Sequence, residues 1–486
     1  MSQVQSFDIF DTLIARRCGD PKAIFFQIEH RLKLDGFAQQ RIAAEASLQT
    51  GSYTLDDIYA TFQNMTGLNP TDVESIKQLE IDVELDNVIP IVENMRKVNN
   101  GDLLISDMYL PPEVIRKLLR KAGFKKHVGL IVTADGKSSG RIWPLVRERL
   151  TIQKHVGDNL RSDVSSPISN GIYGEHLNNS APNNHESFLT SNGFARLSNL
   201  VRELRLRFLE PASGQGTLQK KSLQFSNNIP FLILAATYIN NIADKLGVQN
   251  IAFCSRDCLY LYNIYNALFP SSKQPVADYF YTSRYARVKG STDYLSYFKS
   301  VVTEKTLVVD MCGTGWSLGQ LYANIGIQPP TLLVHFLSDR ENAVKQYGHI
   351  RQYVAPKELG AIVQGLNINN TVLELLNYTE HGMVEDVVYF DNLRNWHPVL
   401  EEPDYPAEVL ESIEAIQDAQ AQFEDVLNDH DVSALLDEIR LNEQKIPGVM
   451  VELYKDMANR MEQLRDLWSY HVRQDTHTMW KLNQLK

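Results

Sequence analysis

Short apolar runs with an acidic or polar residue within or at the end of the run, each followed by a helix-like segment, recur through most of this chain. In the first part of the sequence the runs are "SFDIF" (6–10), "DLLIS" (102–106), "GLIVTA" (129–134), "KHVGD" (154–158) and "GIYGE" (171–175). Strands that alternate with helices predict a parallel sheet covered on both faces. Such a sheet binds ligands at the carboxyl ends of its strands, so the pattern also predicts where a site should lie.

A chain of 486 residues is too long for one hydrophobic core, so two or three domains are expected. Helical periodicity at about 13–105 interrupts the first alternation, and we interpret it as an all-helical insertion between the first two strands. The alternation begins again after polar segments, which predicts a second α/β unit. The predicted domains are an α/β domain at 1–175 that includes the insertion, a linker with one helix at 176–225, a second α/β domain at 226–400 and an acidic helical region at 401–486.

Composition narrows the classes of function. The formal net charge of −11 argues against bulk binding of nucleic acid. Four scattered cysteines do not form a disulfide framework and fit a reducing cytoplasm, where we expect this protein. The longest apolar stretch, "IPFLILAATYI" (229–239), is shorter than the roughly 20 residues that cross a bilayer. We expect a buried helix there, so a membrane-bound substrate would be met at the protein surface.

Reactive residues follow four of the predicted strands in the first domain. Asp8 ends the first strand and Ser106 ends the second. Lys137 lies in the loop after the third, and Asp158 ends the fourth, with Asp163 five residues later. A carboxylate can attack phosphorus when a divalent cation neutralises the phosphate, and carboxylate oxygens suit Mg²⁺. A lysine and a hydroxyl nearby would stabilise the phosphoryl oxygens, so the set predicts magnesium-dependent phosphate chemistry.

Four segments in this order, "FDIFDTL", "LLISD", "GKSSG" and "VGDNLRSD", resemble the ordered motifs of the haloacid dehalogenase (HAD) superfamily. The insertion at 13–105 is similar to its helical cap, and the resemblance covers about residues 1–175. It implies a Rossmann-like parallel sheet, a phosphoaspartyl mechanism and a magnesium cofactor. The residues to which it gives roles are Asp8, Asp11, Ser106 and Lys137 in catalysis, and Asp8, Phe10, Asp158 and Asp163 at the metal.

One position departs from the phosphatases of that superfamily. The residue two after the nucleophile is usually an aspartate that protonates the leaving alcohol, whereas here it is Phe10, and Asp11 follows. Phe10 cannot donate a proton, so dephosphorylation would need Asp11 or a bound water. Dehalogenating members carry an aromatic residue at this position, and a carbon–halogen substrate therefore stays an alternative.

A second segment, "TLVVDMCGTGWSLGQL" (306–321), has the pattern of a buried strand, an acid, a glycine-rich turn and a helix start. Backbone amides at such a turn favour an anion. The segment resembles the phosphoribosyl pyrophosphate (PRPP) loop of phosphoribosyltransferases, although a valine replaces the first of its two acids. The resemblance places Asp310 at the second acid, and Thr314, Gly315 and Ser317 at the cradle of the 5-phosphate.

Charged residues also follow two other strands of the second domain. Arg256 and Asp257 lie where such transferases place a pyrophosphate-binding loop, and Arg284, Arg287 and Lys289 follow the next strand. Arginine forks suit pyrophosphate oxygens. The alternative is that these are ordinary solvated surface cations.

Together the two sites predict one sequence of reactions. The second domain would transfer 5-phosphoribofuranose from PRPP to a sugar hydroxyl, which Glu374, Glu380 or His381 could deprotonate. The first domain would then remove the 5-phosphate, and tethering would couple the two steps.

The whole chain is also similar to two-domain bacterial proteins associated with surface-polysaccharide (O-antigen or capsule) assembly. That resemblance implies a lipid-linked glycan acceptor at the inner face of the membrane, with peripheral membrane contact and no nucleic acid. We expect any oligomer contact to use the C-terminal helices.

Two other functions stay open. The first domain could be a phosphatase for a free sugar phosphate, with a second domain that only binds sugar or nucleotide. Alternatively, the second domain and its acidic helices could be a docking module for a polysaccharide assembly complex, in which case truncation after about residue 400 would abolish function.

Overall fold

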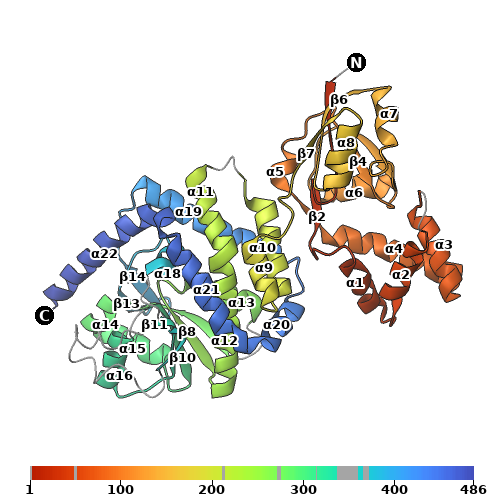
Figure 1. The fold of residues 1–486 in the computed structure, drawn as a ribbon. Coiled ribbons are helices and arrows are strands. Elements are labelled where there is room, and N and C mark those ends of the chain that lie inside the picture. The colour runs from red at the N-terminus through yellow and green to blue at the C-terminus, as the bar shows by residue number, and fades with distance from the viewer. Residues whose placement is uncertain are drawn as a thin grey trace. The chain divides into compact units, whose positions relative to one another are not determined.

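The computed structural model describes residues 3–48, 52–210, 214–270, 275–312, 315–336, 359–364 and 371–485. The chain divides into two compact units, which we call unit 1 (Met1–Ser187 and Arg202–Glu210) and unit 2 (Phe188–Val201 and Pro211–Lys486). Each unit is an α/β structure built on a five-stranded parallel sheet (Figure 1). Within the described ranges, no helix combines the length and apolarity needed to cross a membrane.

The unit 1 sheet has the strand order β5-β4-β1-β6-β7. The chain fills one side of β1 with β4 and β5 and then returns to the other side with β6 and β7. The direction of winding therefore reverses between β1 and β6, which is where open parallel sheets bind ligands. The strands of this sheet are β1 (Gln3–Phe7), β4 (Leu103–Asp107), β5 (Gly129–Thr133), β6 (Thr151–Gly157) and β7 (Tyr173–His176).

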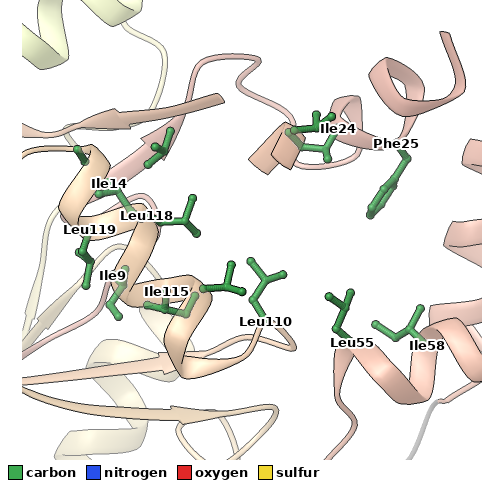
Figure 2. Close-up of a cluster of buried hydrophobic side chains, with 14 of the residues drawn as sticks. Ile9, Ile14, Ile24, Phe25, Leu55, Ile58, Leu110, Ile115, Leu118 and Leu119 are labelled. Carbon is green, nitrogen blue, oxygen red and sulfur yellow. The ribbon is translucent and has the colours of Figure 1, made fainter. Parts of the chain in front are cut away.

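Helices cover both faces of this sheet. On one face, Ile115 and Leu118 of α6 pack with Ile9 and Ile14 (Figure 2). On the other face, Trp143 of α7 packs with residues of β4 and β6. The helices around this sheet are α5 (Val92–Met95), α6 (Pro112–Lys121), α7 (Ile142–Arg147), the π-helical turn η1 (Leu160–Ser165) and α8 (Ser166–Ser169).

The insertion between β1 and β4 is helical but not all-helical. Its helices are α1 (Ala23–Leu32), α2 (Phe37–Ala46), α3 (Leu55–Thr66) and α4 (Pro70–Asn87). The prediction of an all-helical segment is wrong at its two ends, because β2 (Ile14–Arg16) and β3 (Val88–Pro90) pair as antiparallel strands. The chain enters and leaves the insertion side by side, and this long-range pairing is invisible to helical periodicity.

The predicted linker also contains regular structure. Helix α9 (Asn184–Ser191) begins inside the polar stretch 176–193, and α10 (Ala195–Phe208) follows it. Asn183 accepts a hydrogen bond from the Glu186 amide, and the Glu186 carboxylate accepts one from the Asn183 amide. This reciprocal cap is a local sequence signal for the start of a helix. The prediction of a linker did not take it into account.

The unit 2 sheet has the order β12-β11-β10-β8-β9, again with parallel neighbours. Its winding reverses between β8 and β10. The strands are β8 (Asn250–Cys254), β9 (Val276–Phe280), β10 (Thr306–Cys312), β11 (Thr331–Phe336) and β12 (Leu359–Gln364), and an added antiparallel hairpin consists of β13 (Val384–Phe390) and β14 (Asn395–Leu400).

Helices lie on both faces of the unit 2 sheet as well. Phe280 and Val308 pack with Phe298 of α15 and Leu318 of α16 on one face. On the other face, the Phe253 ring contacts that of Tyr265 in α13, with centroids 5.4 Å apart. The helices of this sheet are α13 (Leu259–Leu268), α14 (Arg284–Lys289), α15 (Thr292–Val301), α16 (Trp316–Ile325) and α18 (Thr371–Leu376).

The remaining helices of unit 2 include the expected buried apolar helix, α12, most of whose residues from Ile229 to Ile239 are buried. Their bounds are α11 (Gln215–Leu223), η3 (Gln224–Asn228), α12 (Ile229–Leu246), α19 (Ala407–Leu427), α20 (Val432–Leu441), η5 (Glu443–Lys445), α21 (Ile446–Asn459), η6 (Met461–Leu464) and α22 (Arg465–Gln484). The last of these helices, α22, brings His471 to Glu374 near the carboxyl end of the sheet.

Candidate functional sites

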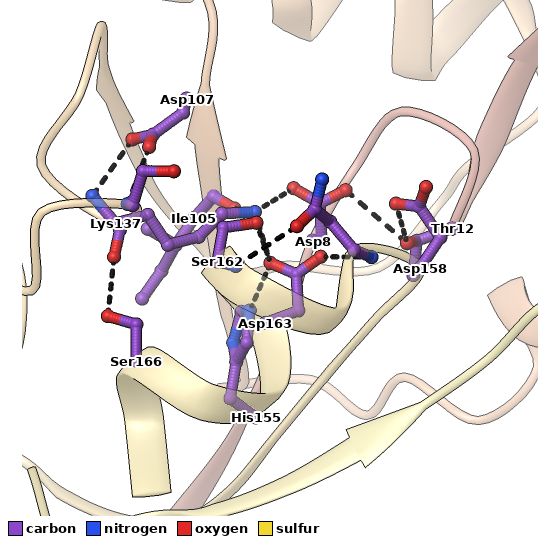
Figure 3. Close-up of polar contacts among 12 residues, drawn as sticks. Asp8, Thr12, Ile105, Asp107, Lys137, His155, Asp158, Ser162, Asp163 and Ser166 are labelled. Carbon is purple, nitrogen blue, oxygen red and sulfur yellow. Dashed lines mark hydrogen bonds and ion pairs between the residues drawn. The ribbon is translucent and has the colours of Figure 1, made fainter. Parts of the chain in front are cut away.

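Three carboxylates meet where the winding of the unit 1 sheet reverses. Asp8 directly follows β1, and its amide donates to the Val156 carbonyl at 2.8 Å, which extends the pairing of β1 with β6. Asp158 directly follows β6, and Asp163 lies on η1. One oxygen of each carboxylate lies within 4.8 Å of the other two, so the three residues could hold a metal ion (Figure 3).

Lys137 brings the balancing positive charge to this cluster. Its ammonium group contacts Asp8 and lies 2.6 Å from Asp163 Oδ1. The loop that bears it is fixed by Asp107 at the end of β4. That carboxylate accepts hydrogen bonds from the Lys137 amide at 3.0 Å and the Ser138 amide at 2.8 Å. The sequence analysis gave Asp107 no role, although it ends the second predicted motif.

Asp163 is held from several directions. Its Oδ1 accepts from Lys137 and from the Ser162 hydroxyl at 3.2 Å, and its Oδ2 accepts from the Asn159 amide at 2.9 Å. His155 Nε2 is 3.2 Å from Oδ1. Asp163 therefore positions Lys137, and it could also offer one oxygen to a cation together with Asp8 and Asp158.

His155 was absent from the predicted site, yet it is fully buried beside Asp163. Burial lowers the pKa of His155 to about 4, so the ring is neutral at pH 7. A neutral ring that donates from Nε2 to Asp163 must accept at Nδ1, and the Ser6 hydroxyl lies 2.8 Å from Nδ1. A lone histidine between Lys154 and Val156 of a strand gave no sequence signal for this contact.

Gly157 makes room for the Asp163 carboxylate. A β-carbon at position 157 would lie 2.4 Å from Asp163 Cγ and Oδ2, much closer than any side chain tolerates. The glycine before Asp158 is therefore required by the close approach of η1 to the end of β6.

The protonation of the cluster reflects a surplus of acids. Burial raises the pKa of Asp8 to about 7, with the charge of Lys137 opposing it and that of Asp163 adding to it. Burial also raises the pKa of Asp158 to about 6. The pKa of Asp163 is instead held below its usual range, since hydrogen bonds from His155 and the charge of Lys137 outweigh burial. A bound cation would favour the ionised carboxylates, and an oxygen-only donor set suits a hard divalent cation.

The other residues predicted for this site differ in burial and in the groups that they can offer to a ligand. Ser106 is buried at the end of β4. The Phe10 ring lies 4.5 Å from the Arg16 guanidinium. Because that side chain carries no oxygen, Phe10 could offer a cation only its backbone carbonyl oxygen. Thr12, which the sequence analysis did not single out, has its hydroxyl 3.3 Å from both Asp8 Oδ2 and Asp158 Oδ1.

Asp11 occupies a left-handed backbone conformation, with φ of 56°. Its carboxylate lies 3.5 Å from the Arg202 guanidinium. Burial raises the pKa of Asp11, while the charge of Arg202 opposes the rise. The charge of Asp11 in turn raises the pKa of Asp158, so the two acids are close enough to interact.

A second group of charged side chains gathers where the winding of the unit 2 sheet reverses. Arg256 and Asp257 follow β8, and Asp310 lies on the adjacent strand β10. Arg287 of α14 reaches this edge, where its guanidinium lies 3.7 Å from Asp310 and donates to Ser317 Oγ at 3.0 Å. The structure thus brings together residues that were predicted from separate segments.

The remaining predicted residues of this site differ in what they do. Gly315 has a φ of 68° and precedes α16, whereas Thr314 lies outside the described residues. Arg284 is exposed, and its charge lowers the pKa of Asp310. Lys289 instead binds Asp386 at 2.8 Å near the surface.

Further side chains complete the group, and of these the sequence analysis had named Glu374 and His381 but not Tyr279, Tyr378 or His471. His471 of α22 places Nε2 3.1 Å from Glu374 Oε2, and the Tyr378 ring lies 4.3 Å below the Arg256 guanidinium. His381 Nε2 lies 2.7 Å from the Tyr279 hydroxyl. No spacing pattern links these residues, because they come from distant segments that only the fold brings together.

No protein-family model matches the chain, and no curated protein has significant sequence similarity to it. The fold and the sites define an α/β protein with two five-stranded parallel sheets and a buried carboxylate cluster that could hold a metal ion.

Proposed function

We propose that unit 1 is a magnesium-dependent phosphatase of the HAD type. The observation that supports this most strongly is the meeting of Asp8, Asp158 and Asp163 around Lys137 at the reversal of winding. The strand order β5-β4-β1-β6-β7 agrees with the proposal, since it brings the first and fourth motifs to adjacent strand ends. Magnesium would neutralise the incoming phosphate and the carboxylates beside it.

In this proposal the Asp8 carboxylate attacks phosphorus and forms a phosphoaspartyl bond, while the bond from phosphorus to the alcohol oxygen breaks. Lys137 stabilises the charge on the phosphoryl oxygens and on Asp8, and Ser106 binds a phosphoryl oxygen. Water then hydrolyses the phosphoaspartate and regenerates Asp8. Asp158, supported by Asp163 and the Phe10 carbonyl, would hold the metal ion.

Asp11 is the best available proton donor for the leaving alcohol. It is the acid next to Phe10, it interacts with Asp158, and burial raises its pKa, which favours a proton-carrying form. A donor of this kind is what the position of Phe10 otherwise lacks.

We propose further that unit 2 binds PRPP and transfers its 5-phosphoribosyl group to a sugar hydroxyl. The supporting observation is the link from Asp310 through Arg287 to Ser317, at the start of the helix that follows β10. Arg287 would bind phosphate oxygens from there, and Arg256 and Arg284 would bind pyrophosphate. Unit 1 would then remove the 5-phosphate from the product. The acceptor in this proposal is a lipid-linked glycan of a surface polysaccharide at the inner membrane face.

The test is to incubate the full chain with Mg²⁺ and either p-nitrophenyl phosphate or ribose 5-phosphate, and to measure inorganic phosphate. We expect release that EDTA abolishes and that Asp8→Asn lacks. In parallel, calorimetric titration with PRPP and Mg²⁺ should show binding. Absence of Mg²⁺-dependent phosphate release would reject the function of unit 1, and absence of PRPP binding would reject that of unit 2.

A further inference from the structure

Asp257 is the most weakly paired acid at the unit 2 site. The other two acids there have partners, since Asp310 lies 3.7 Å from Arg287 and Glu374 lies 3.1 Å from His471. Within the part of the chain that the structure describes, the nearest cationic atom to Asp257 is Arg256 Nε, at 3.9 Å, beyond hydrogen-bond reach. An acid paired this weakly among so many charged groups needs an explanation other than folding.

The position of Asp257 allows a ligand to reach it. Its side chain is 23% exposed, although it lies at the carboxyl end of a buried strand. The Arg256 guanidinium lies over the Tyr378 ring, and its Nε stays 3.9 Å from Asp257 Oδ1, so no hydrogen bond joins the two. A reagent at this edge of the sheet could therefore contact the carboxylate oxygens directly.

The surroundings of Asp257 favour proton transfer near neutral pH. Burial raises its pKa to about 7, the charges of Glu374 and Asp310 add to the rise, and those of Arg256 and His471 oppose it. A general base works best when its pKa lies near the working pH. The titratable groups that interact with it come from several elements. They are Cys254 on β8, Arg256 and Cys258 in the loop after β8, Tyr279 on β9, Asp310 and Cys312 on β10, Glu374 on α18, Tyr378 just after α18, and His471 on α22.

The other candidates for a base are less suitable. His381 already uses both ring nitrogens, with Nε2 at 2.7 Å from the Tyr279 hydroxyl and Nδ1 at 2.9 Å from the Gly382 carbonyl. Glu380 is exposed to solvent. A role for Asp257 in holding pyrophosphate by direct contact is also unfavourable, because a carboxylate repels that anion.

We propose that Asp257 is the catalytic base of unit 2 and removes the proton from the attacking hydroxyl; this inference rests on the proposed phosphoribosyl transfer. The hydroxyl oxygen forms a bond to C1 of the ribose. The bond from C1 to the pyrophosphate oxygen breaks, and its electron pair leaves with pyrophosphate. The proton of the hydroxyl goes to the Asp257 carboxylate, so atoms and charge balance without another reagent.

Glu374 and His471 are positioning residues in this inference. Their contact ties α18 to α22, and their charges act on Asp257 with opposite signs. Removing the Glu374 charge removes an influence that raises the pKa of Asp257. Glu374→Gln should therefore move the pH midpoint of the transfer rate to lower pH, which a purely structural role would not do.

The experiment uses the full chain with PRPP and Mg²⁺, with water or methanol as the hydroxyl acceptor, and measures both PRPP binding and pyrophosphate release across pH. For wild type we expect release above the uncatalysed rate, rising with pH to a plateau. Asp257→Asn should bind PRPP within about threefold of wild type yet release pyrophosphate about 100-fold more slowly, the usual contribution of a general base. Added formate should partly restore Asp257→Ala, and the matched control Asp391→Asn, on an exposed hairpin turn, should behave as wild type.

The outcomes separate the inference from the function on which it rests. If wild type binds PRPP but releases no pyrophosphate to either acceptor, or if Asp257→Asn releases it at the wild-type rate, the inference is wrong while PRPP binding stands. Loss of PRPP binding in Asp257→Asn would make Asp257 a binding residue and would also overturn it. If wild type does not bind PRPP, the proposed function of unit 2 is wrong as well.

Discussion

The two sheets place charged side chains at the same topological position but balance them differently. In unit 1, the Lys137 ammonium group contacts two of the three clustered carboxylates, Asp8 and Asp163, and the nearby histidine is neutral. In unit 2, Arg287 pairs with Asp310 and His471 with Glu374. The first arrangement could hold a cation, whereas the second offers arginines to an anion and leaves one acid, Asp257, with only a distant partner. Similar sheets can thus support different chemistry, because the chemistry depends on the residues at the strand ends.

The largest effect is expected from removing the Asp8 nucleophile, which should abolish the activity of unit 1 and leave that of unit 2 unchanged. Asp8→Asn should lower Mg²⁺-dependent phosphate release by about 10⁴-fold or more, as loss of a covalent nucleophile does. Pyrophosphate release from PRPP should stay at the wild-type rate. A phosphorylated transfer product should accumulate, which mass spectrometry of the reaction mixture would detect. Equal loss of both activities would mean that the two sites do not work independently.

The next effect breaks the unit 2 site alone. Arg287→Met removes a guanidinium that would bind phosphate, and we expect calorimetry to show PRPP affinity about 10- to 100-fold weaker, as for loss of a charged hydrogen bond. Phosphate release from ribose 5-phosphate should not change. Lys289→Met is the matched control, because Lys289 binds Asp386 near the surface. An Arg287→Met protein with normal PRPP affinity would contradict the proposed anion site.

A smaller effect tests the packing beneath the unit 1 cluster. Gly157→Ala places a methyl group where the Asp163 carboxylate lies, so either residue must move. We expect the free energy of unfolding to fall by about 1–3 kcal/mol, as overpacking usually costs, and phosphate release to fall with it. Urea denaturation measures the free energy of unfolding. Gly448→Ala is the comparison, because a β-carbon at that position would meet no atom within 4 Å.

The smallest effect concerns pH and metal in unit 1. The folded-state pKa of Asp8 is raised from 3.8 to about 7, so between about pH 4 and pH 7 the folded protein holds a proton that the unfolded chain has lost. Stability of the metal-free protein should therefore decrease as pH rises through this window. Asp158, with its pKa raised to about 6, acts in the same direction.

Magnesium should oppose that decrease, because it binds the ionised carboxylates of the folded state. We expect Mg²⁺ to raise Tm at pH 7.5 by about 2–4 °C and by less at pH 5, as measured by thermal denaturation. Asp8→Asn should show a weaker response to both pH and Mg²⁺. A Tm increase that is equal at both pH values would argue against metal binding at these carboxylates.

Much of the unit 1 site could be predicted because its residues follow strands directly. Asp8, Ser106 and Asp158 each lie at a strand end, and parallel pairing brings such ends to one edge of a sheet. The contacts of Asp107, His155 and Thr12 could not be predicted in the same way. Each depends on how a loop or a strand face packs, and their sequence contexts are those of ordinary turn or core residues.

In unit 2 the sequence by itself determined the alternation of strands and helices and placed Arg256, Asp257 and Asp310 after or within strands. Only the tertiary structure decided which of them are paired, because Glu374, Tyr378 and His471 come from segments more than 100 residues further along the chain than Arg256. Local periodicity records which side of a helix or strand is buried. It carries no information on which distant helix, here α22, will pack beside a given strand end, although that packing decides which charged groups pair there, as His471 does with Glu374.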